Sequence, residues 1–143
     1  MQYTDISLQG IDAKGKKRDY KLSDFKGEKV VVYFYPKDET FICTKEACDF
    51  RDNLSRAQKK TRVIGVSPDS LDSHLNFHKK EGLNFVLLSD PDRTLAKAFG
   101  IPNMKNGMIS RTTFLLDEDG NIIKEWKDVK VRGHIDEVMR TLN

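Results

Sequence analysis

Six consecutive apolar residues, Val30 to Tyr35, constrain the fold of this chain more than any other feature of its sequence. The run is β-branched and aromatic throughout and does not alternate with polar residues. This pattern is typical of a strand that is buried on both faces of a sheet. The run therefore predicts a central strand, and it is far shorter than the roughly 20 apolar residues that a membrane-spanning helix needs.

Helical and extended segments alternate along the rest of the chain. Asp117 to Asn121 is a strong hairpin-turn signal, and a weaker alternation on both sides of Asp12 to Lys16 predicts an N-terminal hairpin. We expect helices at about 43–60, from 67–70 to near Gly82, at 90–99 and at 135–142, and further strands at 62–66, 85–88, 112–116 and 122–126. This order predicts an α/β fold in which helices flank a central mixed sheet.

The composition predicts one domain and excludes several kinds of partner. With 143 residues, 38% of them hydrophobic and no linker-like stretch, residues 1–143 are expected to fold as a single domain. The 25 Lys and Arg residues and 22 Asp and Glu residues are mixed along the chain and leave a net charge of +3, which argues against nucleic acid as a partner. The N-terminus shows no secretory signal, so we expect a soluble cytoplasmic protein without a membrane partner.

The two cysteines, Cys43 and Cys48, are not needed to staple a core of this size. In a reducing cytosol, a cysteine pair is more often catalytic or metal-binding than structural. Cys43 falls in the first turn of a predicted helix beyond the carboxyl end of the central strand, where α/β sheets bind ligands and free N–H groups stabilise an anion. Cys43 is therefore a candidate thiolate, with a small buried apolar residue as the alternative.

The spacing of the pair adds a geometric argument. Five residues rise about 7.5 Å and turn about 140° in an α-helix, so the two Cα atoms lie roughly 8.6 Å apart. A disulfide requires less than about 7 Å. If both cysteines are helical when reduced, they can be bridged only after local unwinding, which suits a redox cycle better than a static crosslink.

The residues around the cysteines resemble the active-site signature of the peroxiredoxins, Pro-x-x-x-Thr-x-x-Cys from Pro36 to Cys43, with Arg111 before a later strand. Further segments resemble the bacterioferritin-comigratory, or Q, subfamily along essentially the whole chain: Tyr33–Asp38, Glu46–Asp52, Gly65–Ser70, Leu88–Pro91 and Phe99–Gly100. The resemblance implies a thioredoxin-like fold and a thiol peroxidase that reduces hydrogen peroxide and organic hydroperoxides. No metal, haem or flavin cofactor is required.

The resemblance also implies a role for each cysteine. Cys43 is the peroxidatic residue, which becomes a sulfenic acid, and Cys48 is the resolving residue, which forms the Cys43–Cys48 disulfide. A thioredoxin- or glutaredoxin-like reductant then resets the pair through a mixed disulfide. The subfamily contains monomers and dimers, so a monomer or a weak homodimer is expected.

Four further residues receive roles from the same resemblance. The Arg111 guanidinium keeps sulfur anionic and stabilises charge on the peroxide oxygens, and Glu46 orients that arginine. The Thr40 hydroxyl holds sulfur and peroxide in register, and Pro36 shields the thiolate from water. Each residue also has an ordinary structural explanation when it is taken singly: Pro36 could end a strand, Thr40 could cap a helix, Arg111 could be a surface arginine and Glu46 an exposed helical glutamate. Only the joint pattern indicates function.

Phe41 and Ile42 depart from the subfamily, which usually carries Pro-Gly between the threonine and the cysteine. This departure should not remove the activity. It leaves the substrate preference open, and we expect the two apolar side chains to pack against a surface that Pro-Gly would not reach.

Two functions of other classes compete with the peroxidase. One is a redox-switched sensor or chaperone-like module that uses the same cysteine pair. The other is a zinc site formed by both cysteines with His74 and His78, but the cysteine-to-histidine spacing is too long and a packing role for the histidines is favoured. Asp117–Gly120 begins like a calcium loop but lacks its final glutamate and is predicted to be a turn.

Overall fold

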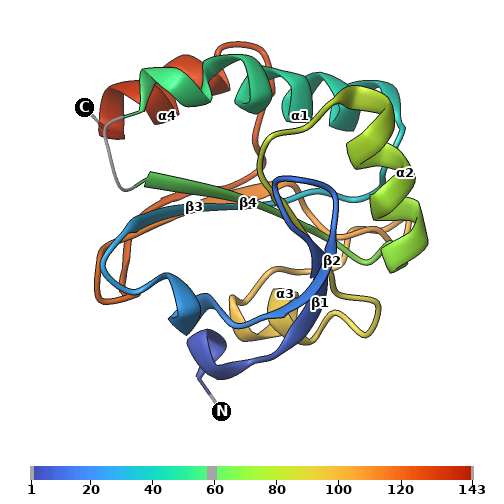
Figure 1. Cartoon of the computed structure of the whole chain (residues 1–143), viewed down its shortest axis with the longest axis horizontal. Coiled ribbons are helices and arrows are strands. Elements are labelled where there is room, and N and C mark those ends of the chain that lie inside the picture. Colours follow the sequence, from blue (N-terminus) through green and yellow to red (C-terminus); the bar gives the residue numbers. More distant parts are fainter. Residues whose placement is uncertain (1, 58–60, 143) are drawn as a thin grey trace.

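The computed structural model describes residues 2–57 and 61–142, and its centre is a seven-stranded mixed sheet (Figure 1). The strand order is β2-β1-β5-β4-β3-β6-β7, in which β3, β4 and β5 are parallel while β1 and β6 run antiparallel to their neighbours. The strands are β1 (Leu8–Ile11), β2 (Lys17–Tyr20), β3 (Lys29–Phe34), β4 (Thr61–Ser67), β5 (Val86–Ser89), β6 (Thr112–Leu116) and β7 (Ile122–Trp126).

Strand β3 lies inside the sheet, between β4 and β6, as the apolar run predicts. Its alternate side chains enter two separate cores. Val32 and Phe34 pack into one core, and Val31 and Tyr33 into the other, all with no exposed surface. Because both faces of the strand are covered, every position of it from Val30 to Phe34 is apolar.

The helices cover both faces of the sheet (Figure 1). Helices α1 (Phe41–Asn53), α2 (Leu71–Glu81) and α4 (His134–Leu142) contribute to the core around Tyr33, whereas α3 (Thr94–Ala98) contributes to the opposite core. Three short 3₁₀ helices, η1 (Tyr3–Asp5), η2 (Leu22–Phe25) and η3 (Leu54–Arg56), complete the described structure. Within the two described ranges, no helix has the length and apolar character needed to cross a membrane.

Helix α1 is shorter than its composition predicts. The sequence predicts a helix to Lys60, but α1 ends at Asn53 and continues as the 3₁₀ turn η3, while residues 58–60 lie outside the described structure. The sheet explains this length. The chain must return beside Lys29, which pairs with Thr61, and a 13-residue helix of about 20 Å matches the length of the six-residue strand β3.

Helix α3 is also shorter than the predicted segment at 90–99. Arg93 has a left-handed backbone, with φ of 59°, which interrupts the helix immediately before Thr94. The Asp90 carboxylate instead accepts hydrogen bonds from the Leu95 and Ala96 N–H groups at 3.2 and 3.0 Å. Asp90 therefore caps the helix from outside rather than forming its first turn.

The two predicted hairpins are confirmed. Strands β1 and β2 pair antiparallel, and β6 and β7 flank the turn at Asp117, whose carboxylate accepts the Asp119 and Asn121 N–H groups. These bonds form an ordinary Asx-type turn. The predicted α/β class with a central mixed sheet, flanking helices and an N-terminal hairpin is therefore correct.

Candidate active site

Cys43 lies at the first turn of α1, where the chain leaves β3. Thr40 is the N-cap residue, with an extended backbone, and its carbonyl accepts the Thr44 N–H at 2.8 Å. This start turns Cys43 toward the sheet, where its side chain is 1% exposed and packs in the core that contains Tyr33 and Tyr35. Its thiol is free of any disulfide.

Arg111 approaches the same thiol from the next strand. It immediately precedes β6, which pairs antiparallel with β3 so that Thr112 stands opposite Phe34, at the end of β3 that leads to Cys43. Arg111 Nη2 donates to Cys43 Sγ at 3.2 Å, and Nη1 donates to Glu46 Oε1 at 2.5 Å. The arginine fork thus holds the sulfur and a carboxylate together, and a charged donor favours the anionic form of sulfur.

Glu46 lies one turn after Cys43 and is buried, with 1% of its surface exposed. Its Oε1 faces Arg111, while Oε2 has no hydrogen-bond partner in the described part of the chain. Burial raises the pKa of Glu46 to about 7, although the charge of Arg111 opposes this shift. Burial acts to lower the pKa of Arg111, but Glu46 and Cys43 outweigh it and raise that pKa.

Thr40 and Pro36 are placed differently from these three residues. The Thr40 hydroxyl donates to the Lys37 carbonyl at 3.0 Å. The predicted contact between this hydroxyl and the Cys43 sulfur is therefore not formed in this structure. Pro36 is half-buried and lines a pocket of about 270 Å³ together with Arg111, Met104 and Met108. The pocket offers a solvent route to the arginine.

Cys48 lies on a different face of α1 and is directed toward α2. Its Sγ donates to Glu81 Oε1 at 3.6 Å, and the thiol is free and half-buried. Burial raises the pKa of Cys48, while the nearby charge of Arg51 acts in the opposite direction. Because α1 is continuous from Phe41 to Asn53, the two sulfurs face different surroundings and are not bridged.

Phe41 and Ile42 do not pack as expected. Phe41 is 83% exposed and Ile42 is 47% exposed, so the prediction that both side chains are covered is wrong. They occupy the first two positions of α1, and the inward face begins with Cys43. The replacement of Pro-Gly therefore places apolar surface at the outside of the helix start.

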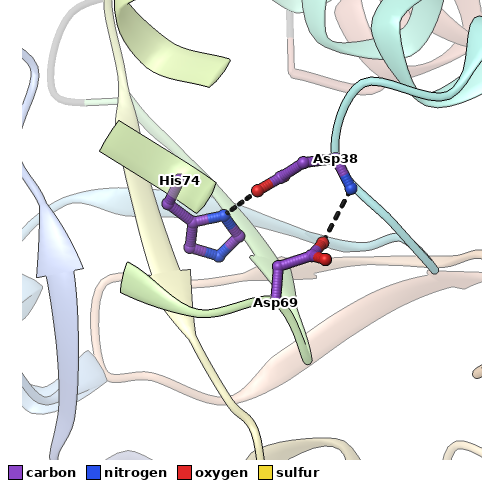
Figure 2. A group of neighbouring side chains, drawn as sticks. All are labelled: Asp38, Asp69 and His74. Carbon is purple, nitrogen blue, oxygen red and sulfur yellow. Dashed lines mark hydrogen bonds and ion pairs between the residues drawn. The ribbon is translucent and has the colours of Figure 1, made fainter. Parts of the chain in front are cut away.

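A buried polar cluster ties the loop before α1 to α2 (Figure 2). Asp38 Oδ2 lies 2.6 Å from His74 Nδ1 and accepts the Ser73 hydroxyl at 2.9 Å, and Asp38 Oδ1 accepts the Tyr35 hydroxyl at 2.6 Å. His74 Nε2 lies 2.8 Å from the Leu88 carbonyl. Both ring nitrogens thus lie within hydrogen-bond distance of oxygen atoms, one of Asp38 and one of the Leu88 backbone.

Asp69 completes this cluster, whose three side chains have ligand atoms within 4.8 Å of one another. Its carboxylate accepts the Asp38 N–H and the Ser67 hydroxyl, both at 2.7 Å. These oxygens and nitrogens are occupied by protein hydrogen bonds, which a metal ion would have to displace. The cluster is therefore best described as a hydrogen-bond network.

The two histidines are buried, as the packing prediction requires, but they do more than fill space. His74 belongs to the Asp38 network, and His78 Nε2 lies 3.2 Å from the Phe85 carbonyl. Neither ring is directed to the cysteines, which removes the predicted alternative of a Cys2His2 zinc site. The partners of His74 could not be predicted from the local sequence pattern, because they lie 14 and 36 residues away along the chain.

The buried Cys43 thiol with a charged donor beside it has the groups that a thiol peroxidase requires, and the comparisons with known proteins support that class. The AhpC/TSA family matches residues 2–125, and the chain belongs to this family. One relative is Peroxiredoxin Bcp of Bacillus subtilis (strain 168), which is 49% identical over 96% of this chain and 90% of that protein. Another is Peroxiredoxin Q, chloroplastic, of Sedum lineare, which is 43% identical over 87% of this chain and 69% of that protein. The predicted resemblance to the Bcp or Q group is confirmed.

Solved structures show the same fold. A cysteine-to-serine variant of peroxiredoxin Q from Xanthomonas campestris has a TM-score of 0.88 and 37% identity, covering 98% of this chain and 90% of that one. The bacterioferritin comigratory protein of the same organism, studied for alkyl peroxide reduction, has a TM-score of 0.86 and 38% identity over 98% and 91%. The predicted thioredoxin-like fold and peroxidase class are therefore correct.

Proposed function

We propose that Cys43 attacks hydrogen peroxide or an organic hydroperoxide and that Arg111 and Glu46 prepare it to do so. The observation that carries this proposal is the Arg111 fork, which donates to Cys43 Sγ and to Glu46 Oε1 at the same time. Glu46 fixes one arm of the guanidinium, so the other arm points at the sulfur. Peroxide oxygens that approach the sulfur meet a charged donor already in place.

The first step forms a sulfenic acid. The Cys43 thiolate attacks one peroxide oxygen, the O–O bond breaks, and the other oxygen leaves as hydroxide or alkoxide and takes a proton from water. The sulfur is oxidised by two electrons and the peroxide is reduced. Arg111 stabilises the charge that develops on the oxygens, and we assign Pro36 to shielding and Thr40 to holding the peroxide once the loop closes on it.

The second step requires part of α1 to unwind. Cys48 attacks the Cys43 sulfenic acid and water is released, which leaves the Cys43–Cys48 disulfide. In an intact helix the Cα separation of about 8.6 Å is too long for this bond. An external dithiol then attacks the disulfide and returns both cysteines to thiols.

The identity of the reductant and the assembly belong to the same proposal. We assign reduction to a thioredoxin- or glutaredoxin-like protein, because the exchange needs a second thiol to release the mixed disulfide.

We further propose that residues 1–143 act as one domain, as a monomer or a weak homodimer, in the cytoplasm. A near-neutral chain with a net charge of +3 provides little long-range steering, so selection rests on the local site.

Rapid mixing with peroxide tests the proposal. Cys43→Ser should abolish peroxide consumption, whereas Cys48→Ser should reduce one equivalent and then stop, because it cannot be recycled by thioredoxin. Full peroxidase activity in Cys43→Ser would overturn the mechanism. A slow peroxide reaction combined with tight, oxidation-dependent binding of a partner protein would instead favour the redox-switched module.

A further inference from the structure

One face of α1 lies against the C-terminal end of α2 and holds the resolving cysteine. Phe41, Thr44, Cys48 and Arg51 recur at spacings of three or four residues and therefore share this face. The Cys48 thiol is directed at the carboxylate of Glu81, the last residue of α2, with Sγ 3.6 Å from Oε1. The contact joins residues 33 positions apart and is formed by the fold.

The Glu81 carboxylate is available as a proton acceptor. On α1, Arg51 directs Nη1 to the Glu81 backbone carbonyl at 2.5 Å and its other nitrogens to Asp52, and Lys45 pairs with Asp49. On α2, the neighbouring Lys80 pairs with Glu39. Across residues 2–57 and 61–142, no ion pair involves the Glu81 carboxylate itself, so the thiol is its hydrogen-bond partner.

Contacts farther along α1 keep Cys48 beside Glu81 when the helix start unwinds. Besides the Arg51 bond to the Glu81 carbonyl, Asn84 Nδ2 donates to the Arg51 carbonyl at 3.1 Å. Phe50, in the same helical turn, is fully buried and stacks on Tyr33 with ring centroids 4.6 Å apart. This part of α1 is held on both its α2 and sheet sides.

The helix start has room to move toward this pair. A hollow of about 470 Å³ lies between the first turns of α1 and the end of α2, and its lining residues are Glu39, Phe41, Thr44, Lys45, Lys80 and Glu81. Cys43 immediately precedes Thr44 in the chain. Unwinding of the first turn can therefore bring Cys43 to the side on which Cys48 and Glu81 already face each other.

We propose that Glu81 is the general base of the resolving step, a role that rests on the proposed peroxidase cycle. As Cys48 Sγ attacks the Cys43 sulfenic acid, Glu81 Oε1 accepts the thiol proton, the S–S bond forms and the Cys43 S–O bond breaks. The Cys48 sulfur is oxidised and the Cys43 sulfur is reduced. The hydroxide that leaves is protonated to water, and Glu81 returns its proton to solvent. A base at this position is needed because a protonated thiol is a poor nucleophile.

Rapid mixing of Glu81→Gln with hydrogen peroxide tests the assignment, with sulfenic acid and disulfide measured separately by quenched mass spectrometry. Sulfenic acid should form at the wild-type rate, while disulfide formation should slow by at least about tenfold at pH 7. The deficit should shrink as pH rises, because the thiol then ionises without help. Asp72→Asn, which removes an exposed carboxylate from the opposite end of α2, should leave both steps unchanged.

A second variant covers the case in which Glu81→Gln disturbs the helix end. Glu81→Ala should resolve slowly, and added formate should restore its disulfide formation in proportion to concentration. Wild-type resolution in Glu81→Gln, a deficit that is the same at every pH, or no response to formate would overturn the assignment. Absence of Cys43 oxidation in the wild type would instead overturn the proposed peroxidase function itself.

Discussion

The carboxyl group of Glu46 is buried beside one cation, and this position has opposing effects on activity and stability. Its Oε1 holds Arg111 so that the arginine points at Cys43, while its Oε2 accepts no hydrogen bond from the described residues. Burial raises the pKa of Glu46 from 4.5 to about 7. The folded protein therefore holds a proton on Glu46 at pH values where the unfolded chain has lost it.

This proton difference predicts a pH-dependent cost of keeping Glu46. Below pH 4.5, Glu46 is protonated in both states and costs nothing, whereas between pH 4.5 and about 7 folding becomes less favourable by up to about 3 kcal/mol. Glu46→Gln has no titrating group. Its free energy of unfolding should therefore rise relative to wild type as pH increases from 4.5 to 7.5, as measured by urea titration at several pH values.

Above pH 7, where Glu46 is ionised in the folded protein, the same variant should lose peroxidase activity, because glutamine provides no charge to fix Arg111. A useful comparison is Glu118→Gln, which removes an exposed carboxylate and should follow the wild-type pH profile. A stability difference between Glu46→Gln and wild type that stays constant across this pH range would show that Glu46 is ionised in both states.

At the scale of elements, the loop between β3 and α1 is fixed by one buried pair. Asp38 and His74 have side chains that are 1% and 0% exposed, and they join the loop to α2 (Figure 2). Glu39, the next residue, has a left-handed backbone with φ of 60°, and Thr40 then caps α1. The pair therefore sets where α1 begins and, three residues later, where Cys43 lies.

Asp38→Ala should lower the free energy of unfolding by about 3 kcal/mol at pH 7, because it leaves His74, Tyr35 and Ser73 without their shared acceptor. Urea titration gives this value directly. Asp72→Ala removes an exposed aspartate from the same helix and should leave the midpoint unchanged. Equal midpoints for the two variants would contradict an anchoring role for Asp38.

Helix α1 should divide into two parts on oxidation. Its first turns must unwind for the disulfide to form, whereas Arg51 and buried Phe50 hold the end of the helix in place. Hydrogen exchange of the disulfide form should show that amides at 45–48 lose protection while those at 51–53 keep it. Peroxide-treated Cys48→Ser cannot form the disulfide, so its amides at 45–48 and at 51–53 should both remain protected. Loss of protection through Asn53 would show that the whole helix unwinds.

The sequence pattern predicts the elements well where burial alone determines them. The β3 run is apolar because both faces are covered, and its position inside the sheet follows from that pattern. The end of α1 could not be predicted in this way, since residues 54–57 favour a helix in composition. The helix has to end early enough for β4 to begin beside Lys29 of β3, and this pairing exists only in the folded sheet.

Some residues of the candidate site could likewise be predicted from the sequence, and others could not. Cys43, Cys48 and Arg111 follow from spacing and from the family signature, because chemistry restricts which residue types can stand there. Glu81 and His74 gave no such signal, because their partners come from other elements of the folded chain. A glutamate at a helix end and a histidine on an apolar face are common in sequences without any such contact.

For the whole molecule, the proposed cycle links the redox state of two sulfurs to the stability of the fold. In the reduced protein, Cys43 and Ala47 are buried against the sheet and Arg111 holds the sulfur. Oxidation replaces these contacts with a covalent bond that closes a loop of only six residues, which stabilises a fold by about 2 kcal/mol. Exposing the buried side chains and breaking several hydrogen bonds of the first turns costs more, about 4 kcal/mol.

The disulfide should therefore destabilise this protein, in contrast to most disulfides. Urea unfolding of the oxidised protein should have a lower midpoint than that of the reduced protein, by about 2 kcal/mol in free energy of unfolding. Cys48→Ser, measured with and without a dithiol after peroxide has been removed, gives the contribution of Cys43 oxidation alone. A higher midpoint for the oxidised wild type would mean that the bridge forms without loss of the packing around Cys43. A lower midpoint for the oxidised wild type would mean that α1 regains stabilising contacts when the disulfide is reduced, so that refolding of α1 favours reduction by a partner dithiol.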